Sequence, residues 1–297
     1  MEELLPNARL RIISHDLQLI DTAGVDVIIA PQVPWLPQAV RTCPRLRWLH
    51  LLTAGAERVF EFGLHRGSYW ITKSSGVNAS AVAEYALGAL LFLVKRFGAF
   101  SEQQRERVWR RYWLEELTGR RATVLGLGHV GIEIARRCLP FGLSLVGVSR
   151  RANPVPEVER VYSSDRIGDA VRGSDVLFVA LPLTSETRHI VDDEVLTSLN
   201  HGAYLVDVSR GGITSAVALV RALDSGQLAG AALDVFEDEP LPADSTLWSV
   251  SNLLLTPHVA GTTNRFMDRA LDTIARNLKA IRETGTPVTP VNSEIGY

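Results

Sequence analysis

Short apolar runs alternate with segments of mixed polarity along the N-terminal part of the chain. Four of these runs are rich in β-branched and aromatic residues, are bounded by turn-forming residues, and predict strands at 10–14, 25–30, 46–52 and 69–75. The segment PWLPQAVRTCP, between the second and third runs, predicts a helix because prolines mark both of its ends. Strands that alternate with helices favour a parallel sheet with crossover helices.

A second and clearer series of apolar runs follows further along the chain. Six near-continuous apolar segments predict strands buried on both faces, at 122–128, 144–149, 175–182, 202–209, 230–236 and 252–258. Helical segments lie between most of them, which predicts a doubly wound, Rossmann-type parallel sheet and places the protein in the α/β class. A last helix is expected over about 264–284, ending at Gly285.

Between the two series, residues 78–107 predict one long helix. It is apolar on most sides as far as Phe97, so we expect it to be buried. The 297 residues suit two ordinary domains or one large α/β domain.

Charge and composition exclude several classes of protein. The formal net charge is −2, so neither nucleic acid nor an anionic membrane surface is expected as a partner. The most apolar stretch, residues 86–94, is much shorter than the roughly 20 residues of a membrane-spanning helix, and the N-terminus lacks the features of a signal peptide. Cys43 and Cys138 fit two reduced thiols, and no set of Cys and His has zinc-ligand spacing. We therefore expect a cytoplasmic protein without a metal.

A glycine-rich loop follows the first strand of the second series. Gly126, Gly128 and Gly131 form G-x-G-x-x-G, and His129 and Val130 open the helix that follows. In this strand–loop–helix context the pattern predicts a dinucleotide site: the first glycine allows the tight turn, the second lets the pyrophosphate approach the backbone, and the third lets the helix pack on the strand. The free N–H groups of the helix N-terminus favour the pyrophosphate charge.

The residues after the next strand predict which dinucleotide binds. NAD-specific folds tend to place Asp or Glu at this point, where its carboxylate accepts a hydrogen bond from the adenosine 2′-OH. This chain has Ser149, Arg150 and Arg151 instead. The serine removes a carboxylate that would repel a 2′-phosphate, and the arginines can pair with that phosphate. The sequence therefore predicts a preference for NADPH over NADH.

Three further strand ends carry an Arg, a cluster of carboxylates and a His. They are Arg210 in LVDVSRGG, the carboxylates from Asp234 to Glu239 in AALDVFEDEPL, and His258 in LLLTPHVAG. Ligands of doubly wound sheets bind beyond the carboxyl ends of the strands, so we expect these groups to converge. An arginine can bind a substrate carboxylate, a histidine can exchange a proton near neutral pH, and a carboxylate can orient the imidazole.

At this point the chain resembles a known family, the D-isomer-specific 2-hydroxyacid dehydrogenases. The motifs that carry the resemblance run nearly end to end: TAGAERV, GVNASAVAEYALGALLFLVKR, GLGHVG, LPLTSETRHIVD, LVDVSRGG, ALVRALDSGQLAGAALDVFEDEPLP and LWSVSNLLLTPHVAGTT. In spacing and in its arginine-rich cofactor loop the chain looks most like the NADPH-dependent glyoxylate/hydroxypyruvate reductases.

The resemblance implies a role for each matching residue. Arg210 matches the substrate-binding arginine, His258 the acid/base, Glu239 its carboxylate partner, and Asp234 a residue that holds the nicotinamide carboxamide. The implied substrate-binding backbone lies at Ala54, Gly55 and Ala56. The implied cofactor crevice is completed by Leu181, Pro182, Thr184, Val208 and Ser209.

The resemblance also implies an architecture and an activity. Residues 1–94 with 266–297 would form a flavodoxin-like substrate domain, and residues 95–265 the Rossmann cofactor domain. The helix after Asn78 would supply part of a homodimer interface. The implied activity is NADPH-preferring reduction of small 2-oxo acids to D-2-hydroxy acids. Two alternatives remain: a dehydrogenase for another acid, such as phosphoglycerate, lactate or a branched-chain acid, and a non-catalytic dinucleotide-sensing protein like the family's corepressors.

Overall fold

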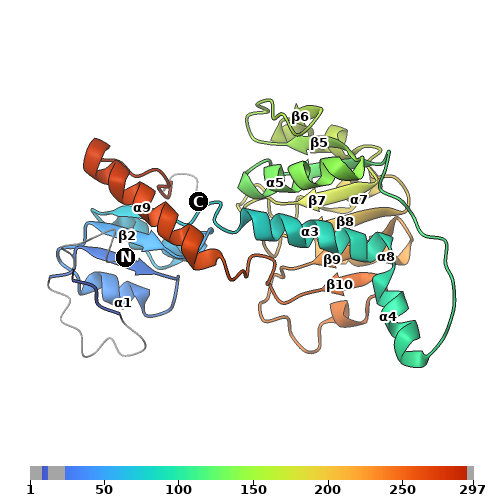
Figure 1. Ribbon diagram of the computed structural model, residues 1–297, viewed down its shortest axis with the longest axis horizontal. Helices are drawn as coiled ribbons and strands as arrows, with labels where there is room; N and C mark the ends of the chain where they lie inside the picture. Colours follow the sequence, from blue (N-terminus) through green and yellow to red (C-terminus); the bar gives the residue numbers. More distant parts are fainter. Residues whose placement is uncertain (1–8, 13–23, 293–297) are drawn as a thin grey trace. The chain divides into compact units, whose positions relative to one another are not determined.

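The computed structural model describes residues 9–12 and 24–292 (Figure 1). Contacts divide the chain into two compact units. The first unit comprises residues up to Asn78 together with those from Thr263 onward, and the second comprises Ala79–Thr262. Each unit contains its own parallel sheet, so the predicted α/β class is confirmed.

The first unit has a three-stranded parallel sheet in the order β1-β2-β3. Its strands are β1 Val27–Ala30, β2 Trp48–Leu51 and β3 Trp70–Lys73, and its helices are α1 Leu36–Arg41, α2 Glu57–Glu61, η2 Leu64–Arg66 and α9 Phe266–Thr284. Three of the four predicted strands are thus confirmed. Of the fourth, at 10–14, residues 10–12 are not in a strand and 13–14 lie outside the described residues. The last helix ends at Gly285, as predicted, in a left-handed conformation with φ of 77°.

The second unit has a seven-stranded sheet in the order β10-β9-β8-β7-β4-β5-β6, and every neighbouring pair is parallel. All six predicted strands are present, as β4 Arg121–Leu125, β5 Ser144–Val148, β7 Val176–Val179, β8 Ala203–Asp207, β9 Leu228–Leu233 and β10 Leu253–Leu255. The edge strand β6, Arg160–Tyr162, was not predicted, because three residues with a polar start carry too little apolar pattern.

Helices cover both faces of this sheet. On one face, α3 Ala79–Val94 and α5 His129–Cys138 pack on β4, β7, β8 and β9, and Figure 1 shows both helices lying across the sheet. On the other face, the cover is formed by α6 Ile167–Val171, α7 Asp193–Thr197 and α8 Ala216–Asp224. The short turns η3 Leu139–Phe141, η4 Ser164–Arg166 and η5 Thr246–Ser249 complete the unit. Burial on both faces explains why its strands are apolar throughout.

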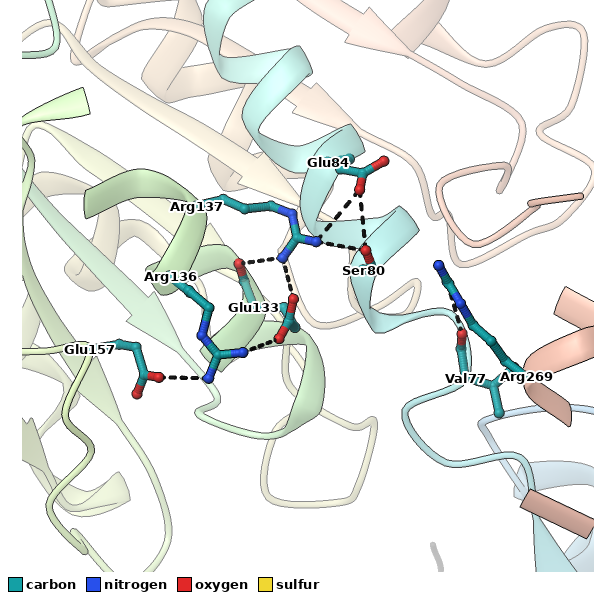
Figure 2. A network of polar contacts seen from close by, with 8 residues as sticks. All are labelled: Val77, Ser80, Glu84, Glu133, Arg136, Arg137, Glu157 and Arg269. Carbon is teal, nitrogen blue, oxygen red and sulfur yellow. Dashed lines mark hydrogen bonds and ion pairs between the residues drawn. The ribbon is translucent and has the colours of Figure 1, made fainter. Parts of the chain in front are cut away.

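Helix α3 belongs to the second unit, whereas the sequence prediction assigned residues 79–94 to the substrate domain. The reason is its packing: Ala83, Ala86 and Leu90 are fully buried in the core that α3 shares with α5. A polar contact adds to this packing. Arg137 of α5 donates to the Ser80 hydroxyl at 2.6 Å (Figure 2). The unit boundary therefore falls at the start of α3 and not at its end.

The linker before α3 is tied to the first unit. The Arg269 guanidinium of α9 donates to the carbonyl of Val77 at 3.3 Å (Figure 2). In the second unit, the first turn of α3 lies beside a network in which Arg136 pairs with Glu133 at 2.5 Å and Glu157 at 2.7 Å.

The predicted single helix over 78–107 is wrong. It is two helices, α3 and α4 Phe97–Glu106, separated at Arg96, whose φ of 52° is left-handed and cannot continue an α-helix. Residues 107–117 follow without helix or strand. Across the ranges 9–12 and 24–292, no helix combines the length and apolarity that crossing a bilayer requires.

Both cysteines are reduced thiols and buried, as expected. Burial raises the pKa of the Cys138 thiol to about 12, so it stays protonated at neutral pH and is a poor nucleophile.

Candidate active site

A histidine and a carboxylate meet on two loops that follow adjacent strands. Glu239 lies on the loop after β9, and His258 lies on the loop after β10. Nδ1 of His258 is 2.7 Å from Oε2 of Glu239. The other oxygen, Oε1, accepts the backbone N–H of Phe236 at 3.0 Å. An ionised carboxylate only accepts hydrogen bonds, so Nδ1 carries a proton and Nε2 is left for exchange with a substrate.

Asp234 fixes the loop that carries His258. Its carboxylate is buried, and it accepts the backbone N–H of Val259 at 2.9 Å, that of Ala260 at 2.8 Å and the Thr256 hydroxyl at 2.6 Å. These donors flank His258 on both sides. The histidine itself has a φ of 51°, a left-handed conformation that is costly outside glycine and persists only where its surroundings enforce it. One carboxylate therefore holds the imidazole-bearing residue in a strained conformation.

Helix α3 reaches the same loop. The Tyr85 hydroxyl is 2.6 Å from Oγ1 of Thr256, which in turn donates to Asp234. Burial raises the pKa of Tyr85, so this phenol is neutral and acts as the donor. The resemblance gave Asp234 the nicotinamide carboxamide, and that role stays a prediction. The structure adds a role that the sequence did not reveal, in which Asp234 anchors the loop of His258.

Arg210 lies at the end of β8, beside the loop that carries Glu239. Its Nη1 donates to the carbonyl of Ser209 at 2.7 Å. The next residue, Gly211, makes a close approach: a Cβ there would lie 1.8 Å from the carbonyl oxygen of Phe236. Only glycine allows this contact, and the contact brings the Arg210 turn next to the Glu239 loop.

Asp207 supports the Arg210 turn, a role the sequence prediction missed. It is buried, and its carboxylate accepts the N–H of Ser209 at 2.9 Å and the hydroxyl of Thr214 at 2.6 Å, as well as the Ser209 hydroxyl. Burial raises the pKa of Asp207 to about 6, although these hydrogen bonds act to lower it and the charge of Asp234 acts to raise it. The signal in the sequence was a charged residue inside an otherwise apolar strand.

The glycine loop has the shape that a dinucleotide requires. Gly126 has a φ of 99°, and a Cβ there would lie 2.5 Å from the carbonyl oxygen of Ala180. A Cβ on Gly131 would lie 1.9 Å from the carbonyl oxygen of Gly126, so the third glycine lets α5 pack against the loop. A Cβ on Gly128 would meet no atom within 4 Å. The backbone therefore borders open space at the N-terminus of a ten-residue helix, which is where a pyrophosphate would be held.

The residues predicted to select the cofactor follow β5 directly. Ser149 donates its N–H to the carbonyl of Tyr162 at 3.0 Å, which fixes the start of the turn. Arg150 and Arg151 are both exposed in that turn. The segment lies at the same carboxyl edge of the sheet as Gly126, since β4 and β5 are parallel neighbours.

The predicted crevice residues also lie at this edge, in the loops after β7 and β8. Val208 and Ser209 are buried, and Leu181, Pro182 and Thr184 are half-buried. The N–H and hydroxyl of Ser209 are both taken up by Asp207, so Ser209 supports the turn in addition to any contact with a cofactor.

The predicted carboxylate-binding backbone belongs to the first unit, between β2 and α2. The Thr53 carbonyl accepts the N–H of Ser74 at 3.0 Å. Because C=O and N–H point in opposite directions across a trans peptide, the N–H of Ala54 points away from that donor. In the described ranges, neither this N–H nor that of the buried Ala56 has a hydrogen-bond acceptor. Ala54 is half-buried and Ala56 is fully buried, and unpaired buried N–H groups such as that of Ala56 are rare in native structures, so this loop fits an anion.

No metal site accompanies these groups in the part of the chain that the structure describes, where no cluster of His, Cys, Asp and Glu could hold an ion. A glycine loop for a dinucleotide, a His–carboxylate pair and an arginine at neighbouring strand ends are the groups expected of a dinucleotide-dependent oxidoreductase.

The comparisons give the family. Residues 87–260 match the family described as D-isomer specific 2-hydroxyacid dehydrogenase, NAD binding domain, and the chain belongs to this family. It is therefore an NAD(P)-dependent oxidoreductase of a family that acts on small 2-oxo and 2-hydroxy acids. The family and the enzyme class expected from the sequence motifs are confirmed.

Relatives and solved structures agree with this assignment. Glyoxylate reductase of Thermofilum pendens is 32% identical over 267 residues, which cover 87% of this chain and 78% of that protein. The D-isomer specific 2-hydroxyacid dehydrogenase of Xanthobacter autotrophicus Py2, solved in complex with NADPH and MES, is 29% identical with a TM-score of 0.85, covering 100% of this chain and 93% of that one. A family protein from Aeromonas salmonicida is 31% identical with a TM-score of 0.81, covering 90% and 85%.

Proposed function

We propose that this protein reduces small 2-oxo acids of the glyoxylate or hydroxypyruvate kind to D-2-hydroxy acids, with NADPH as the preferred reductant. The observation that carries the proposal is the pairing of His258 with Glu239, next to the strand end that bears Arg210. The likeness to the glyoxylate reductase of Thermofilum pendens supports the choice of substrate.

Each of these residues has a defined chemical task in such a reduction. The nicotinamide, when bound, supplies the hydride. His258 in its protonated form donates the Nε2 proton to the ketone oxygen, and Glu239 holds the Nδ1 proton and stabilises the imidazolium. Arg210 binds the substrate carboxylate and polarises the ketone, favouring the negative charge that develops on its oxygen in the transition state.

The preference for NADPH rests on the turn after β5. A carboxylate at this position would repel the 2′-phosphate, and Ser149 has none. The exposed guanidinium groups of Arg150 and Arg151 supply positive charge in the same turn. The related enzyme of Xanthobacter autotrophicus was solved with NADPH, which is in keeping with this choice.

We also propose that the enzyme works as a homodimer in which residues 107–117 cover the partner subunit. This segment has no helix or strand, and it presents Trp109 at 95% and Trp113 at 100% exposure. Large aromatic side chains so fully exposed mark an interaction surface. A second copy of the same chain is the partner we expect, because most oligomers of soluble proteins are symmetric homo-oligomers.

The proposed activity is tested with a panel of 2-oxo acids, followed by the loss of NADPH or NADH absorbance. We expect glyoxylate or hydroxypyruvate to give the highest kcat/KM, and NADPH to exceed NADH. Turnover confined to pyruvate, phosphonooxypyruvate or a branched 2-oxo acid would replace the proposed substrate with another of the family. No turnover of any 2-oxo acid would reject the reductase.

A further inference from the structure

Among the side chains that the structure describes, that of Gln32 is the one from outside the loop of Thr53–Ala56 that hydrogen-bonds to it. Gln32 lies two residues after the end of β1, and its carboxamide contacts the loop. Nε2 donates to Oγ1 of Thr53 at 2.9 Å and to the carbonyl of Gly55 at 3.0 Å. Oε1 accepts the N–H of Val59, in the first turn of α2, at 3.2 Å. One amide thus binds the loop at two points and the first turn of α2 at a third.

The orientation of this amide is set by its partners. The Gly55 carbonyl can only accept a hydrogen bond, and the Val59 N–H can only donate one, so Nε2 must face the former and Oε1 the latter. The Thr53 hydroxyl accepts from Gln32 and donates to the same Gly55 carbonyl at 2.8 Å. Glutamine is the residue that supplies two donors and one acceptor in this arrangement, and neither Glu nor Leu can replace it.

The bonds to the Thr53 and Gly55 carbonyls determine where the next two backbone amides point. Gln32 draws the Gly55 carbonyl inward, and the Ser74 N–H draws the Thr53 carbonyl inward at 3.0 Å. Across a trans peptide the next N–H points the opposite way, so the N–H of Ala54 is turned away from Ser74 and the N–H of Ala56 is turned away from Gln32. Two such amides, directed by two tied carbonyls, form the donor pair that a carboxylate needs.

We infer that Gln32 is a positioning residue for substrate recognition: by binding the Gly55 carbonyl and capping α2 at Val59, it directs the Ala54 and Ala56 amides at the carboxylate of the substrate. The inference rests on the proposed function for the identity of that carboxylate. Gln32 does not touch the substrate. The N-cap residue Ala56 makes no side-chain hydrogen bond, so Gln32 Oε1 supplies a second acceptor for the Val59 N–H, which also donates to the Ala56 carbonyl at 3.0 Å.

The first experiment measures carboxylate binding without turnover. Oxalate is titrated calorimetrically into the NADP⁺-loaded enzyme and its variants. Gln32→Leu removes all three bonds, and Gln32→Glu keeps the acceptor for Val59 while losing the donor to Gly55. We expect both to weaken oxalate binding on the order of tenfold or more, because misdirected Ala54 and Ala56 amides lose hydrogen bonds to a charged ligand, and to leave NADP⁺ affinity unchanged. Gln38→Leu, an exposed glutamine of α1, is the matched control.

The second experiment separates positioning from a general structural effect. The kcat/KM of the best 2-oxo acid is compared with that of its methyl ester, which lacks the carboxylate charge. We expect Gln32→Glu to lower the ratio of acid to ester, chiefly through the KM of the acid. Amide hydrogen exchange in residues 53–59 should rise in Gln32→Leu, with exchange in β9 unchanged. The double variant with Thr53→Val should lose less than the sum of the two single losses, because both groups act on Gly55.

The outcomes distinguish the inference from the proposed function. Equal losses for acid and ester, unchanged oxalate affinity in both variants, or no binding of oxalate by the wild type would overturn the role of Gln32. A wild type that reduces no 2-oxo acid overturns the proposed function, whereas the oxalate and exchange measurements still decide the inference.

Discussion

Nδ1 of His258 lies 2.7 Å from Oε2 of Glu239, although the two residues follow different strands of the sheet. The second oxygen of Glu239 is occupied by the N–H of Phe236, so the carboxylate is fixed in place from both sides. The proton on Nδ1 is therefore held by a preorganised acceptor, and the tautomer of the imidazole is set before a substrate arrives.

This pair gives the first prediction. We expect His258→Gln to lower kcat by about 10²–10⁴-fold, the usual contribution of a general acid. Glu239→Gln should also lower kcat strongly, because its amide can present N–H to Nδ1 and stabilise the wrong tautomer. Steady-state rates with a saturating 2-oxo acid measure both losses. The control is Glu237→Gln, two residues away, whose carboxylate pairs with His189. Wild-type rates in the first two variants would reject the assignment.

The cofactor preference gives a second prediction. Arg150→Asp places a carboxylate where a 2′-phosphate would bind, so we expect the ratio of kcat/KM for NADPH over NADH to fall at least tenfold, or about 1.4 kcal/mol. Arg172→Asp makes the same charge change in an exposed residue before the amino end of β7, far from the carboxyl edge. It should leave the ratio unchanged. A wild-type ratio at or below one would contradict the predicted preference.

The third prediction concerns the aromatic segment after α4. If Trp109 and Trp113 cover a partner subunit, replacing both with Asp should convert the dimer to a monomer, because two buried charges at an interface are unpaired. Light scattering after size exclusion measures the mass directly. Val217→Asp, at a 65% exposed position of α8, is the control and should keep the wild-type mass. A double variant that remains dimeric would place the interface elsewhere.

The fourth prediction follows from a buried histidine in the first unit. His50 is completely buried, and its ring nitrogens contact the Thr72 hydroxyl at 2.6 Å and the Ser74 hydroxyl at 3.1 Å. The Ser74 hydroxyl donates to the Leu51 carbonyl, so it accepts from Nε2–H, and the Thr72 hydroxyl, which accepts from Trp48, has its own proton left for Nδ1. The ring is therefore neutral. Burial lowers the pKa of His50 to about 4 from 6.5.

The consequence is a pH-dependent stability. Between pH 4 and 6.5 the unfolded chain binds a proton at His50 and the folded chain does not. The contribution of His50 to the free energy of unfolding is therefore complete above pH 6.5 and is lost as the pH falls towards 4. The full difference is about 3 kcal/mol. His50→Gln should lose this pH dependence, measured as the difference in Tm between pH 4.5 and 7.5 relative to wild type.

Asp207 is the matched control, because its effect on stability changes with pH in the opposite direction. The pKa of Asp207 is raised to about 6 by burial, so its contribution is present at low pH and is lost as the pH rises through 6. The change in Tm that Asp207→Asn causes relative to wild type should therefore be more favourable at pH 7.5 than at pH 4.5. If His50→Gln and wild type show the same slope, the histidine does not titrate as described.

Much of this structure is readable from the sequence because its determinants are local. Buried parallel strands are apolar at every position, so nine of the ten predicted strands appear. Arg210, His258 and the carboxylates from Asp234 to Glu239 stand out in the sequence because parallel strands present their carboxyl ends at one edge, where polar residues follow an apolar run; only the family resemblance singled out Glu239 among the carboxylates. Gln32 also follows an apolar strand and gave the same signal. Its significance depends on Thr53, Gly55 and Val59, which only the folded chain brings to it.

The errors have a common physical origin. The break at Arg96 depends on one left-handed residue, and no periodicity marks it. The membership of α3 in the second unit depends on which neighbour buries its apolar face, and an evenly apolar helix does not say which neighbour that is. Tertiary packing determines where such a helix breaks and which unit it joins, and a single sequence carries little information about that packing.

Because Asp234 anchors the loop of His258, activity can be lost while the sheet stays folded. The loop of His258 is neither helix nor strand, and three of the hydrogen bonds that hold it go to that one carboxylate. Mild heating or low denaturant can release this loop while the seven-stranded sheet persists. Inactivation would then precede unfolding, and an engineer who wants a more durable catalyst should reinforce residues 256–260 before the core.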